Sequence, residues 1–248
     1  MIKLTAALSP RPGWTVPEWL IHYRERHAPL TAAVTNFTRH GVRYLQNYAL
    51  HAPDVPAFPD RDDSKVAVTE LWFEDVAAIR AAYSEPDYFK YLRTDELRFC
   101  SFEPLIAGLA REVELFNTPQ EGDKAYVTLP RHKIFAFRRR REGTDIAAFH
   151  AAWEKERGPA MLAFAPFRQW VRRYVQSQML DEDIGLPGGV DHDLIDEYYF
   201  DSAADAVAFW SAYTSATEMA AEDAKHADTA ATWTIFAQEH EVFGPLPE

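Results

Sequence analysis

The chain carries one pattern of residues twice. When residue 3 is set against residue 133, an offset of 130, matching residues recur as far as position 46. The matches are Lys3 with Lys133, Ala6 with Ala136, Trp19 with Phe149, Tyr23 with Trp153, Pro29 with Pro159, Phe37 with Phe167, Arg43 with Arg173, Tyr44 with Tyr174 and Gln46 with Gln176. A repeat of this length constrains the fold strongly, because each copy must be able to form the same structural unit.

The matches continue after a deletion of three residues in the second copy. They pair Glu70 with Glu197, Phe73 with Phe200, Ala110 with Ala237, Glu112 with Glu239, Glu114 with Glu241 and Phe116 with Phe243. The deletion falls between residues 48 and 66, where Pro and Asp residues cluster as they do in loops, and loops tolerate changes of length. We therefore expect two diverged units, residues 1–120 and 121–248.

Each unit predicts the same order of elements. Apolar strands at 2–8 and 132–138 open the two copies, and in the first copy a helix begins after Thr15, with Pro17 in its first turn. Its buried stripe comprises Val16, Leu20, Tyr23, His27, Leu30, Val34 and Phe37, and Pro29 should kink or interrupt the helix, as Pro159 should in the second copy. Strands at about 40–49 and 65–73 follow, then a helical stretch at 75–99 broken near 84–86, and a strand at 110–116.

This order, βαββαβ, is typical of the ferredoxin-like plait, in which both helices cover one face of an antiparallel sheet. A single plait leaves the other face of its sheet exposed, and two fused copies bury these faces against each other. The fold class expected is therefore α+β, with two tandem ferredoxin-like repeats forming an intramolecular dimeric α/β barrel. The chain is then an internal pseudo-dimer, and a homodimer of such chains is the alternative assembly.

Composition excludes several classes of protein. The 248 residues carry a net charge of −12, which argues against a nucleic-acid partner. No apolar stretch approaches the ~18 residues of a membrane span, and no secretory signal opens the chain, so a cytoplasmic location is expected. The single cysteine, Cys100, excludes a disulfide framework and a cysteine-based metal site. Aromatic residues make up 14% of the chain, enough to line a sizeable pocket.

The segment 18–30, EWLIHYRERHAPL, resembles the helix signature of EthD-domain proteins, in which an aromatic-rich helix ends in His-x-Pro. Residues 95–99 and 42–47 are similar to that family's second helix and second strand, whereas the second half has Arg157-Gly158-Pro159 in place of His-x-Pro. The resemblance implies a soluble dimeric α/β barrel without an obligatory cofactor. Relatives of this fold include polyketide cyclases, dehydratases, muconolactone isomerases and cofactor-free monooxygenases.

His27 is the first candidate for catalysis. It lies on the buried stripe one turn after Tyr23, where an imidazole could act as acid or base near neutral pH. The alternative is a structural histidine bonded to carbonyl groups freed near Pro29. Glu70 is the residue expected to orient the imidazole, although it and the other repeated glutamates more simply form ion pairs between strands or repeats, with Arg43 and Arg173 as repeated cations.

The remaining candidates are aromatic residues and a second histidine. Trp19, His22, Tyr44, Trp72, Tyr88 and Tyr91 are predicted to bind substrate, with packing in the core as the alternative. In an α-helix His22 and His27 would point about 140° apart, so the two histidines should not share one face of the helix. No tight cluster of metal-ligating residues is evident, and no metal site is predicted.

These residues favour an enzyme that acts on a small hydrophobic metabolite with an aromatic ring or a carbonyl group. The expected chemistry is dehydration, cyclisation or isomerisation by general acid–base catalysis, with no metal or nucleotide cofactor. His27 would move the proton, and Tyr23 or Tyr88 would hydrogen-bond the developing oxyanion. A cofactor-free monooxygenase, a non-catalytic binding protein and a haem-binding barrel are the alternatives.

Overall fold

The computed structural model describes residues 1–51, 53–118, 131–182 and 189–244. The boundary expected between the two units, at residues 120 and 121, lies outside these ranges and stays a prediction. In the part of the chain that is described, no helix is both long and apolar enough to cross a membrane.

The predicted order of elements is present in both halves, with helices split into shorter pieces. The first repeat contains β1 Ile2–Pro10, α1 Val16–His22, the π-helix η1 Tyr23–His27, α2 Ala28–Ala33, α3 Thr35–Thr38, β2 Gly41–Ala49, β3 Ala67–Phe73, α4 Val76–Ser84, the π-helix η2 Tyr88–Arg93, α5 Thr94–Phe99 and β4 Cys100–Asn117. The second contains β5 His132–Arg138, α6 Ile146–Ala152, the π-helix η4 Trp153–Arg157, α7 Gly158–Ala163, α8 Ala165–Trp170, β6 Arg173–Met179, β7 Leu194–Phe200, α9 Ala203–Ser215, α10 Thr217–His226, the 3₁₀ turn η5 Thr229–Ala231 and β8 Trp233–Phe243.

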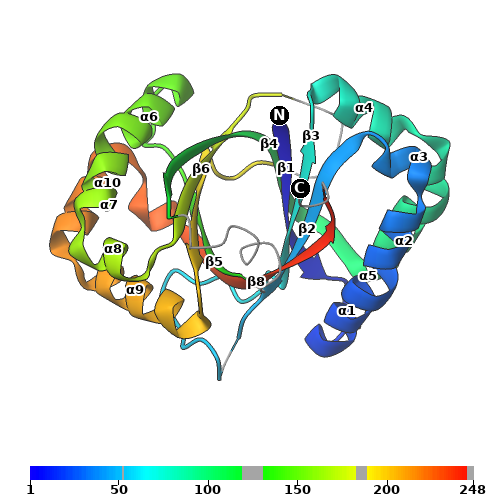
Figure 1. The fold of residues 1–248 in the computed structure, drawn as a ribbon, viewed down its shortest axis with the longest axis horizontal. Coiled ribbons are helices and arrows are strands. Elements are labelled where there is room, and N and C mark those ends of the chain that lie inside the picture. The colour runs from blue at the N-terminus through cyan, green and yellow to red at the C-terminus, as the bar shows by residue number, and fades with distance from the viewer. Residues whose placement is uncertain (52, 119–130, 183–188, 245–248) are drawn as a thin grey trace.

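The strands form one closed antiparallel barrel in the order β1-β3-β2-β8-β5-β7-β6-β4. The two repeats meet at the pairs β2·β8 and β4·β6, and their helices cover opposite sides of the barrel (Figure 1). Strand β4 begins at Cys100, ten residues before the expected start at 110. Its first part pairs with β1 of its own repeat and its second part with β6 of the other, so one long strand links the two sheets.

Alternation along each strand separates two environments. Successive side chains of a strand point to opposite faces, so those of β3 alternate between the barrel interior and the helices. Leu71 packs in the core under the helices of the first repeat, whereas Val68 packs inside the barrel with Phe135 and Ile195 of the second repeat. The barrel therefore has an apolar interior at one level, and the charged residues described below occupy another.

The α-helix is interrupted ahead of Pro29, as expected, and the interruption is the π-helix at Tyr23–His27. Proline has no N–H to donate to the carbonyl four residues earlier, and in an α-helix its ring would clash with that carbonyl. The helix widens instead, and the N–H of Ala28 donates to the carbonyl of Tyr23, five residues earlier. Gly158 makes the same bond to Trp153 ahead of Pro159, so both repeats adopt this turn for the same reason.

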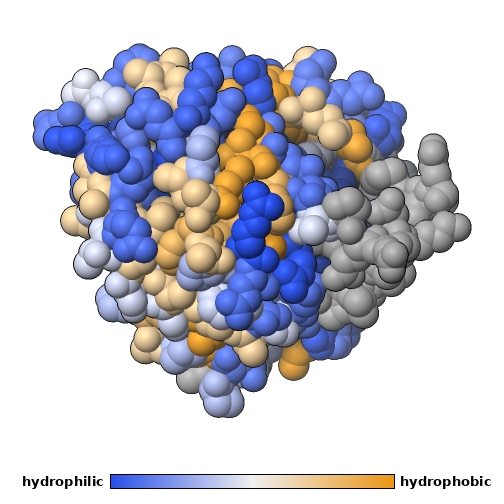
Figure 2. Space-filling model, turned by 60° about the vertical axis from the view of Figure 1, so that its left-hand side comes forward, coloured by the Kyte–Doolittle hydropathy of each residue, from blue (hydrophilic) through white to orange (hydrophobic). Residues whose placement is uncertain are grey.

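The outer surfaces of the two helical layers differ. Figure 2 brings the side of the second repeat forward, and there hydrophilic residues flank a narrow strip of hydrophobic ones. Four of the large hydrophobic residues that are exposed lie on helices of the first repeat: Ile21, Phe89, Tyr91 and Leu97. The main hydrophobic clusters lie between each helical layer and the sheet, and inside the barrel.

Candidate functional site

A cavity of about 90 Å³ lies in the first repeat, between its helices and the outer face of the sheet. Aliphatic side chains of β1 and β3 form one wall, and Phe37 and Phe99 from the helices contribute to the other. The aromatic content predicted a sizeable pocket, and this cavity is small. Tyr83 and Tyr88, with ring centroids 4.8 Å apart, and Phe37, stacked on Tyr88 at 5.6 Å, fill much of the space.

His27 lines this cavity and is held by an acidic residue from another helix. Its Nδ1 lies 3.1 Å from Oδ2 of Asp95, and both side chains are largely buried. Among the described residues no hydrogen bond to Nε2 of His27 is found, and the ring faces the cavity. An aspartate that accepts the Nδ1 proton leaves the lone pair of a neutral imidazole on Nε2, as in other histidine–carboxylate pairs that act as bases.

Asp95 is a residue that the sequence interpretation missed. Burial by itself would raise the pKa of this carboxyl, but hydrogen bonds and charge from His27 and His22 hold it below its ordinary value. A signal was present in the sequence, because Asp95 stands in the segment similar to the EthD second helix and the second repeat carries Asp223 in the corresponding segment. No spacing rule connects Asp95 to His27, since the contact joins α5 to the end of η1.

A chain of hydrogen bonds ends at a second polar point of the cavity. Gln46 Nε2 donates to the backbone carbonyl of Tyr23 at 3.2 Å, which fixes the orientation of the amide, and also to Tyr44 Oη at 2.8 Å. Tyr44 donates to Tyr23 Oη at 3.3 Å, and Tyr23 Oη lies 2.5 Å from Thr69 Oγ1. Burial raises the pKa of both tyrosines, so their phenols stay protonated.

The Tyr23–Thr69 pair keeps one proton available to a ligand. Each hydroxyl carries one proton, and the bond between them uses only one of the two. Tyr44 is the donor in its hydrogen bond to Tyr23, so that bond does not use the remaining proton of the Tyr23–Thr69 pair. Both residues line the cavity, so this proton can be donated to an oxygen atom bound there.

At another part of the cavity wall the polar groups satisfy one another. Tyr88 Oη donates to Glu96 Oε2 at 3.1 Å, and Arg93 lies 3.4 Å from the same oxygen while its guanidinium covers the ring of Phe102. Cys100 also lines the cavity, and burial raises the pKa of its thiol, which keeps it protonated and unreactive. This wall fits a substrate by shape more than by charge.

Five of the predicted site residues lie outside the cavity. Glu70 does not contact His27, and the expected orienting role is wrong because strand alternation turns Thr69 toward the helices and Glu70 into the barrel. Trp72 also points into the barrel, where its Nε1 donates to Glu112. Trp19 is buried behind Tyr23 and donates to the carbonyl of Phe99, His22 binds Asp95, and Tyr91 is 40% exposed on the surface. Tyr23, His27, Tyr44 and Tyr88 do line the cavity.

His22 and His27 share one side of the helix, which corrects the expectation drawn from α-helical geometry. His22 Nε2 lies 3.1 and 3.2 Å from the two carboxylate oxygens of Asp95, so both histidines contact the same side chain. The π-helical turn explains the difference, because its hydrogen bonds join residues five apart and bring positions 22 and 27 close in projection.

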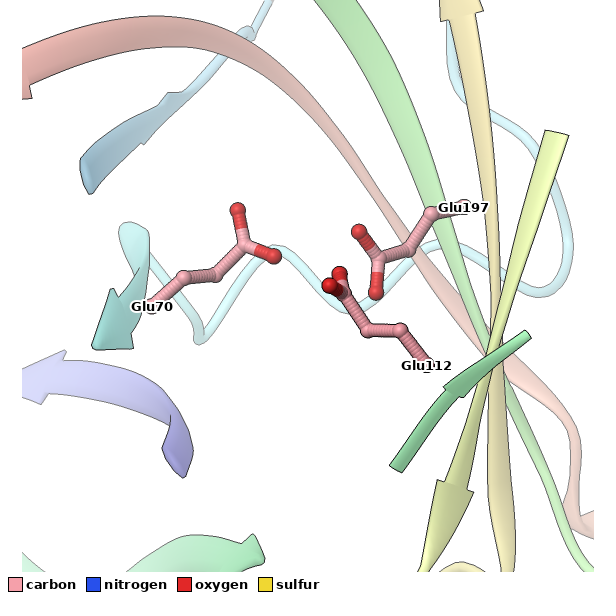
Figure 3. A group of neighbouring side chains, drawn as sticks. All are labelled: Glu70, Glu112 and Glu197. Atoms are coloured by element: carbon pink, nitrogen blue, oxygen red, sulfur yellow. The ribbon is translucent and has the colours of Figure 1, made fainter. Parts of the chain in front are cut away.

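Inside the barrel, glutamates of both repeats surround buried lysines. Glu70 points across the interior toward Glu112 and Glu197 (Figure 3), and Lys3 Nζ binds all three, at 3.0 Å from Glu70 and from Glu112. Lys133 binds Glu70 and Glu239, each at 2.7 Å. The ion pairs predicted between repeats are confirmed, and they include Arg43 with Glu241 and Arg173 with Glu114.

The three carboxylates around Lys3 are close enough together to suggest a metal site. Their oxygens already surround the ammonium group of Lys3, which supplies the positive charge that a bound cation would supply. Burial raises the pKa of Glu197 to about 7, with the attraction of Lys3 opposing this rise and the neighbouring Glu70 adding to it. Burial by itself would lower the pKa of Lys3, but the charges of these glutamates raise it above its ordinary value. Lys3 therefore stays charged.

In the second repeat, charged side chains fill the space that corresponds to the cavity. Arg157 stands at the position of His27, is completely buried, and binds Asp223 at 3.0 Å. Arg138 binds Asp196 at 3.0 Å and Asp223 at 3.4 Å. The guanidinium of Arg157 donates hydrogen bonds to the hydroxyl oxygens of Tyr174, Tyr198 and Tyr213. Two arginines and two aspartates balance in charge, and they occupy the position that corresponds to His27 in the first repeat.

The model of the EthD domain matches residues 11–103 and 141–230, one match in each repeat. The chain belongs to the EthD-domain family. Its two EthD domains are arranged in tandem, as the internal repeat and the barrel indicate. No curated protein sequence matches this EthD protein.

Solved structures with the same fold are very distant in sequence. A putative monooxygenase from Lactobacillus acidophilus has 8% identity and a TM-score of 0.50, with 98% of this EthD protein and 94% of that chain covered. A putative monooxygenase from Fusobacterium nucleatum has 7% identity and a TM-score of 0.51, with 96% and 91% covered. Chlorite dismutase from Candidatus Nitrospira defluvii has 12% identity and a TM-score of 0.51, with 97% and 92% covered. At these identities the likeness shows the fold alone.

Proposed function

We propose that the first EthD repeat catalyses proton transfer on a small, mostly apolar molecule that carries a carbonyl or phenol oxygen. The observation that carries the proposal is the His27–Asp95 pair, whose free Nε2 faces an apolar cavity that also presents a hydroxyl proton from the Tyr23–Thr69 pair. A base and an oxygen-binding donor in one cavity are what the removal of a proton next to a carbonyl requires.

In the proposed reaction Nε2 of neutral His27 takes a proton from a carbon atom next to the substrate carbonyl. Asp95 accepts the Nδ1 proton and stabilises the imidazolium that forms, while the Tyr23–Thr69 pair donates a hydrogen bond to the enolate oxygen. The imidazolium then returns the proton to a different carbon, which completes an isomerisation, or to a departing hydroxyl group, which completes a dehydration. The apolar wall excludes water from the intermediate.

The cavity limits the size of the substrate. Its volume of about 90 Å³ is smaller than the ~150 Å³ cavity that holds one benzene molecule. A single ring with short substituents therefore requires side-chain movement in the helical layer, and the aromatic side chains of Tyr83 and Tyr88 are those that occupy the space. This favours single-ring or acyclic carbonyl compounds over polycyclic ones.

Haem does not fit the cavity that His27 faces. Cavities for drug-sized ligands occupy roughly 300–1,000 Å³, and the cavity that His27 faces holds about 90 Å³. The corresponding space in the second repeat holds the Arg157 cluster and offers no imidazole at that position. We therefore propose no step through a haem.

The proposal is tested by hydrogen–deuterium exchange in D₂O, followed by proton NMR, on a panel of small ketones, hydroxyketones and phenolic ketones. Wild-type protein is expected to exchange or eliminate protons next to the carbonyl of at least one compound. His27→Asn keeps an N–H that can donate to Asp95 but has no basic atom, so the rate should fall by about 10²- to 10⁴-fold with the fold unchanged by circular dichroism. His240→Gln, which alters an exposed histidine on β8, serves as the control.

An unchanged rate in folded His27→Asn would overturn the proposed role of the base. If compounds bind to the wild-type protein and no proton exchanges, the protein is a binding protein and not an enzyme of this class. Oxygen uptake in the same incubations would identify the alternative, a cofactor-free monooxygenase.

A further inference from the structure

Asp95 is held from two sides by histidines of one helix. His22 Nε2 contacts both carboxylate oxygens, at 3.1 and 3.2 Å, and His27 Nδ1 contacts Oδ2 at 3.1 Å. The side chain of His22 is 19% exposed, against 9% for His27, so His22 is the more solvent-accessible member of the group. An ionised carboxylate can only accept, so the nitrogen that each histidine turns toward Asp95 must carry a proton.

Aromatic contacts fix the ring of His22 independently of Asp95. The ring meets the edge of Trp14 at a centroid distance of 5.2 Å and lies 4.7 Å from Phe99. Trp14 is itself anchored, because its Nε1 donates to the carbonyl of Arg98 at 3.0 Å. His22 is therefore a preorganised donor, and its position outside the cavity lining means that it does not contact a bound ligand.

The second repeat holds its aspartate from two sides as well, with different residues. Asp223 is bound by Arg157 at the position of His27, and by Arg138 and Tyr213. Ala152 stands at the position of His22 and offers no donor. In both repeats, therefore, the buried aspartate accepts a hydrogen bond from a second residue besides the one at position 27 or 157. In the first repeat, among the described residues, that second donor is His22.

We propose that His22 is a positioning residue that keeps Asp95 oriented to accept the Nδ1 proton of His27, and so keeps the lone pair of His27 on Nε2. Without the bond from His22, the carboxylate is free to rotate and keeps a single donor. His27 then populates both neutral tautomers, and the form protonated on Nε2 cannot act as the base. The catalytic consequence rests on the proposed function, whereas the effect on the tautomer does not.

The test compares two substitutions of His22 by ¹⁵N NMR of histidine side chains, which distinguishes Nδ1–H from Nε2–H tautomers. In His22→Gln the side-chain amide can still reach Asp95 with an N–H, and neutral His27 should remain in the Nδ1–H form, as in the wild type. In His22→Leu the donor is lost, and His27 should become a mixture of tautomers. His240→Gln controls for the removal of a histidine elsewhere.

The kinetic readout follows the same pattern. With any compound that the wild type turns over, His22→Leu should lower kcat by about 10- to 100-fold, the range found when the hydrogen-bond partners of metal-ligating histidines are changed. KM should stay within about twofold, because His22 is not part of the cavity wall, and His22→Gln should recover most of kcat. A merely structural role would lower the amount of folded protein and leave the tautomer of His27 unchanged.

Two results would overturn the proposal: a pure Nδ1–H tautomer of His27 in folded His22→Leu, or equal loss of the tautomer in His22→Gln and His22→Leu. These outcomes are separate from failure of the proposed function. If wild-type protein exchanges no proton on any compound, the reaction is rejected, while the NMR comparison still decides the role of His22.

Discussion

Asp95 accepts a hydrogen bond from Nδ1 of His27 at 3.1 Å, and this bond ties the helix after β1 to the helix before β4. The second repeat preserves the geometry with other chemistry, since Asp223 binds Arg157 at 3.0 Å. A guanidinium stays protonated at any physiological pH and cannot serve as a base. An aspartate bound by the residue at position 27 or 157 is therefore present in both repeats. In the first repeat this residue is a histidine that faces a cavity.

Replacing the aspartate in each repeat should separate catalysis from stability. Asp95→Asn presents an N–H₂ group or a weaker acceptor to His27, so the tautomer needed for catalysis is lost and proton exchange should fall by about 10²- to 10⁴-fold. Asp223→Asn should leave exchange nearly unchanged and lower the free energy of unfolding by about 3–5 kcal/mol, because it leaves Arg157 and Arg138 buried with less counter-charge. Exchange NMR and urea denaturation measure the two effects. The reverse pattern would place the active repeat in the second half.

Substitutions of Tyr23 and Thr69 should have non-additive effects on the rate of proton exchange. Tyr23→Phe leaves the Thr69 hydroxyl free to donate to the substrate oxygen, and Thr69→Val leaves the Tyr23 hydroxyl, so each single change should slow exchange modestly. The double variant has no donor there and should lose about 10²- to 10³-fold. A double-mutant cycle on kcat measures the coupling. Additive effects would show that one hydroxyl alone contacts the substrate, and Thr69→Ser is the control that restores the donor.

Lys3 should be among the most important residues for the stability of the barrel. Lys3→Met removes the ammonium that binds Glu70, Glu112 and Glu197, and leaves these carboxylates without their shared counter-charge. Breaking a buried ion pair in this way costs about 3–5 kcal/mol, which urea denaturation can measure. Arg24→Met is the control, since its pair with Glu25 is exposed and should contribute little. Equal stability of both variants would show that the ammonium group of Lys3 does not stabilise the glutamate cluster.

Glu197 predicts a specific dependence of stability on pH. Its pKa in the folded protein is about 7, above the ordinary value of 4.5, so between these values the folded state holds a proton that the unfolded state has lost. The free energy of unfolding that Glu197 contributes should therefore increase as the pH falls from 8 to 5. Glu70 and Glu112 have lowered pKa values in the folded protein. The stability that these two carboxylates contribute is therefore lost only at more acidic pH.

The measurement is the difference in unfolding free energy between wild type and Glu197→Gln at several pH values from 8 to 5. Because the amide does not titrate, this difference isolates Glu197 from Lys3, Lys133 and Tyr199, which face it inside the barrel. It should shift in favour of the wild type as the pH falls. A constant difference, or one that shifts the opposite way, would show that Glu197 is ionised throughout this range.

The fold could be predicted from the sequence because both halves of the chain carry the same pattern of apolar residues. Each strand and helix occurs twice, so a weak signal in one copy is supported by the other, and the elements followed in the expected order. The start of β4 was placed too late because residues 100–109 include Glu103 and Pro104 and lack the alternation of a half-buried strand. These residues pair with β1, which was predicted as a strand, but the pairing depends on tertiary structure and is not visible in the local sequence.

The site was predicted in part, and the failures have distinct physical reasons. His27, Tyr23 and Tyr44 were found because one face of a helix and one face of a strand follow fixed periods. Glu70 was wrong by one position, since a strand reverses its side at every residue and Thr69 faces the cavity instead. The relation of His22 to His27 was wrong because α-helical geometry does not hold across the π-helical turn.

The two seams of the barrel, β2·β8 and β4·β6, join halves that belong to one chain. In a barrel made of two identical subunits, every substitution is duplicated, and a change that fills one cavity also fills the other. Here Arg157 can close one cavity while His27 keeps the other open. Covalent linkage thus releases the two halves from symmetry, and a stabilising change in one half does not have to be compatible with catalysis in the other.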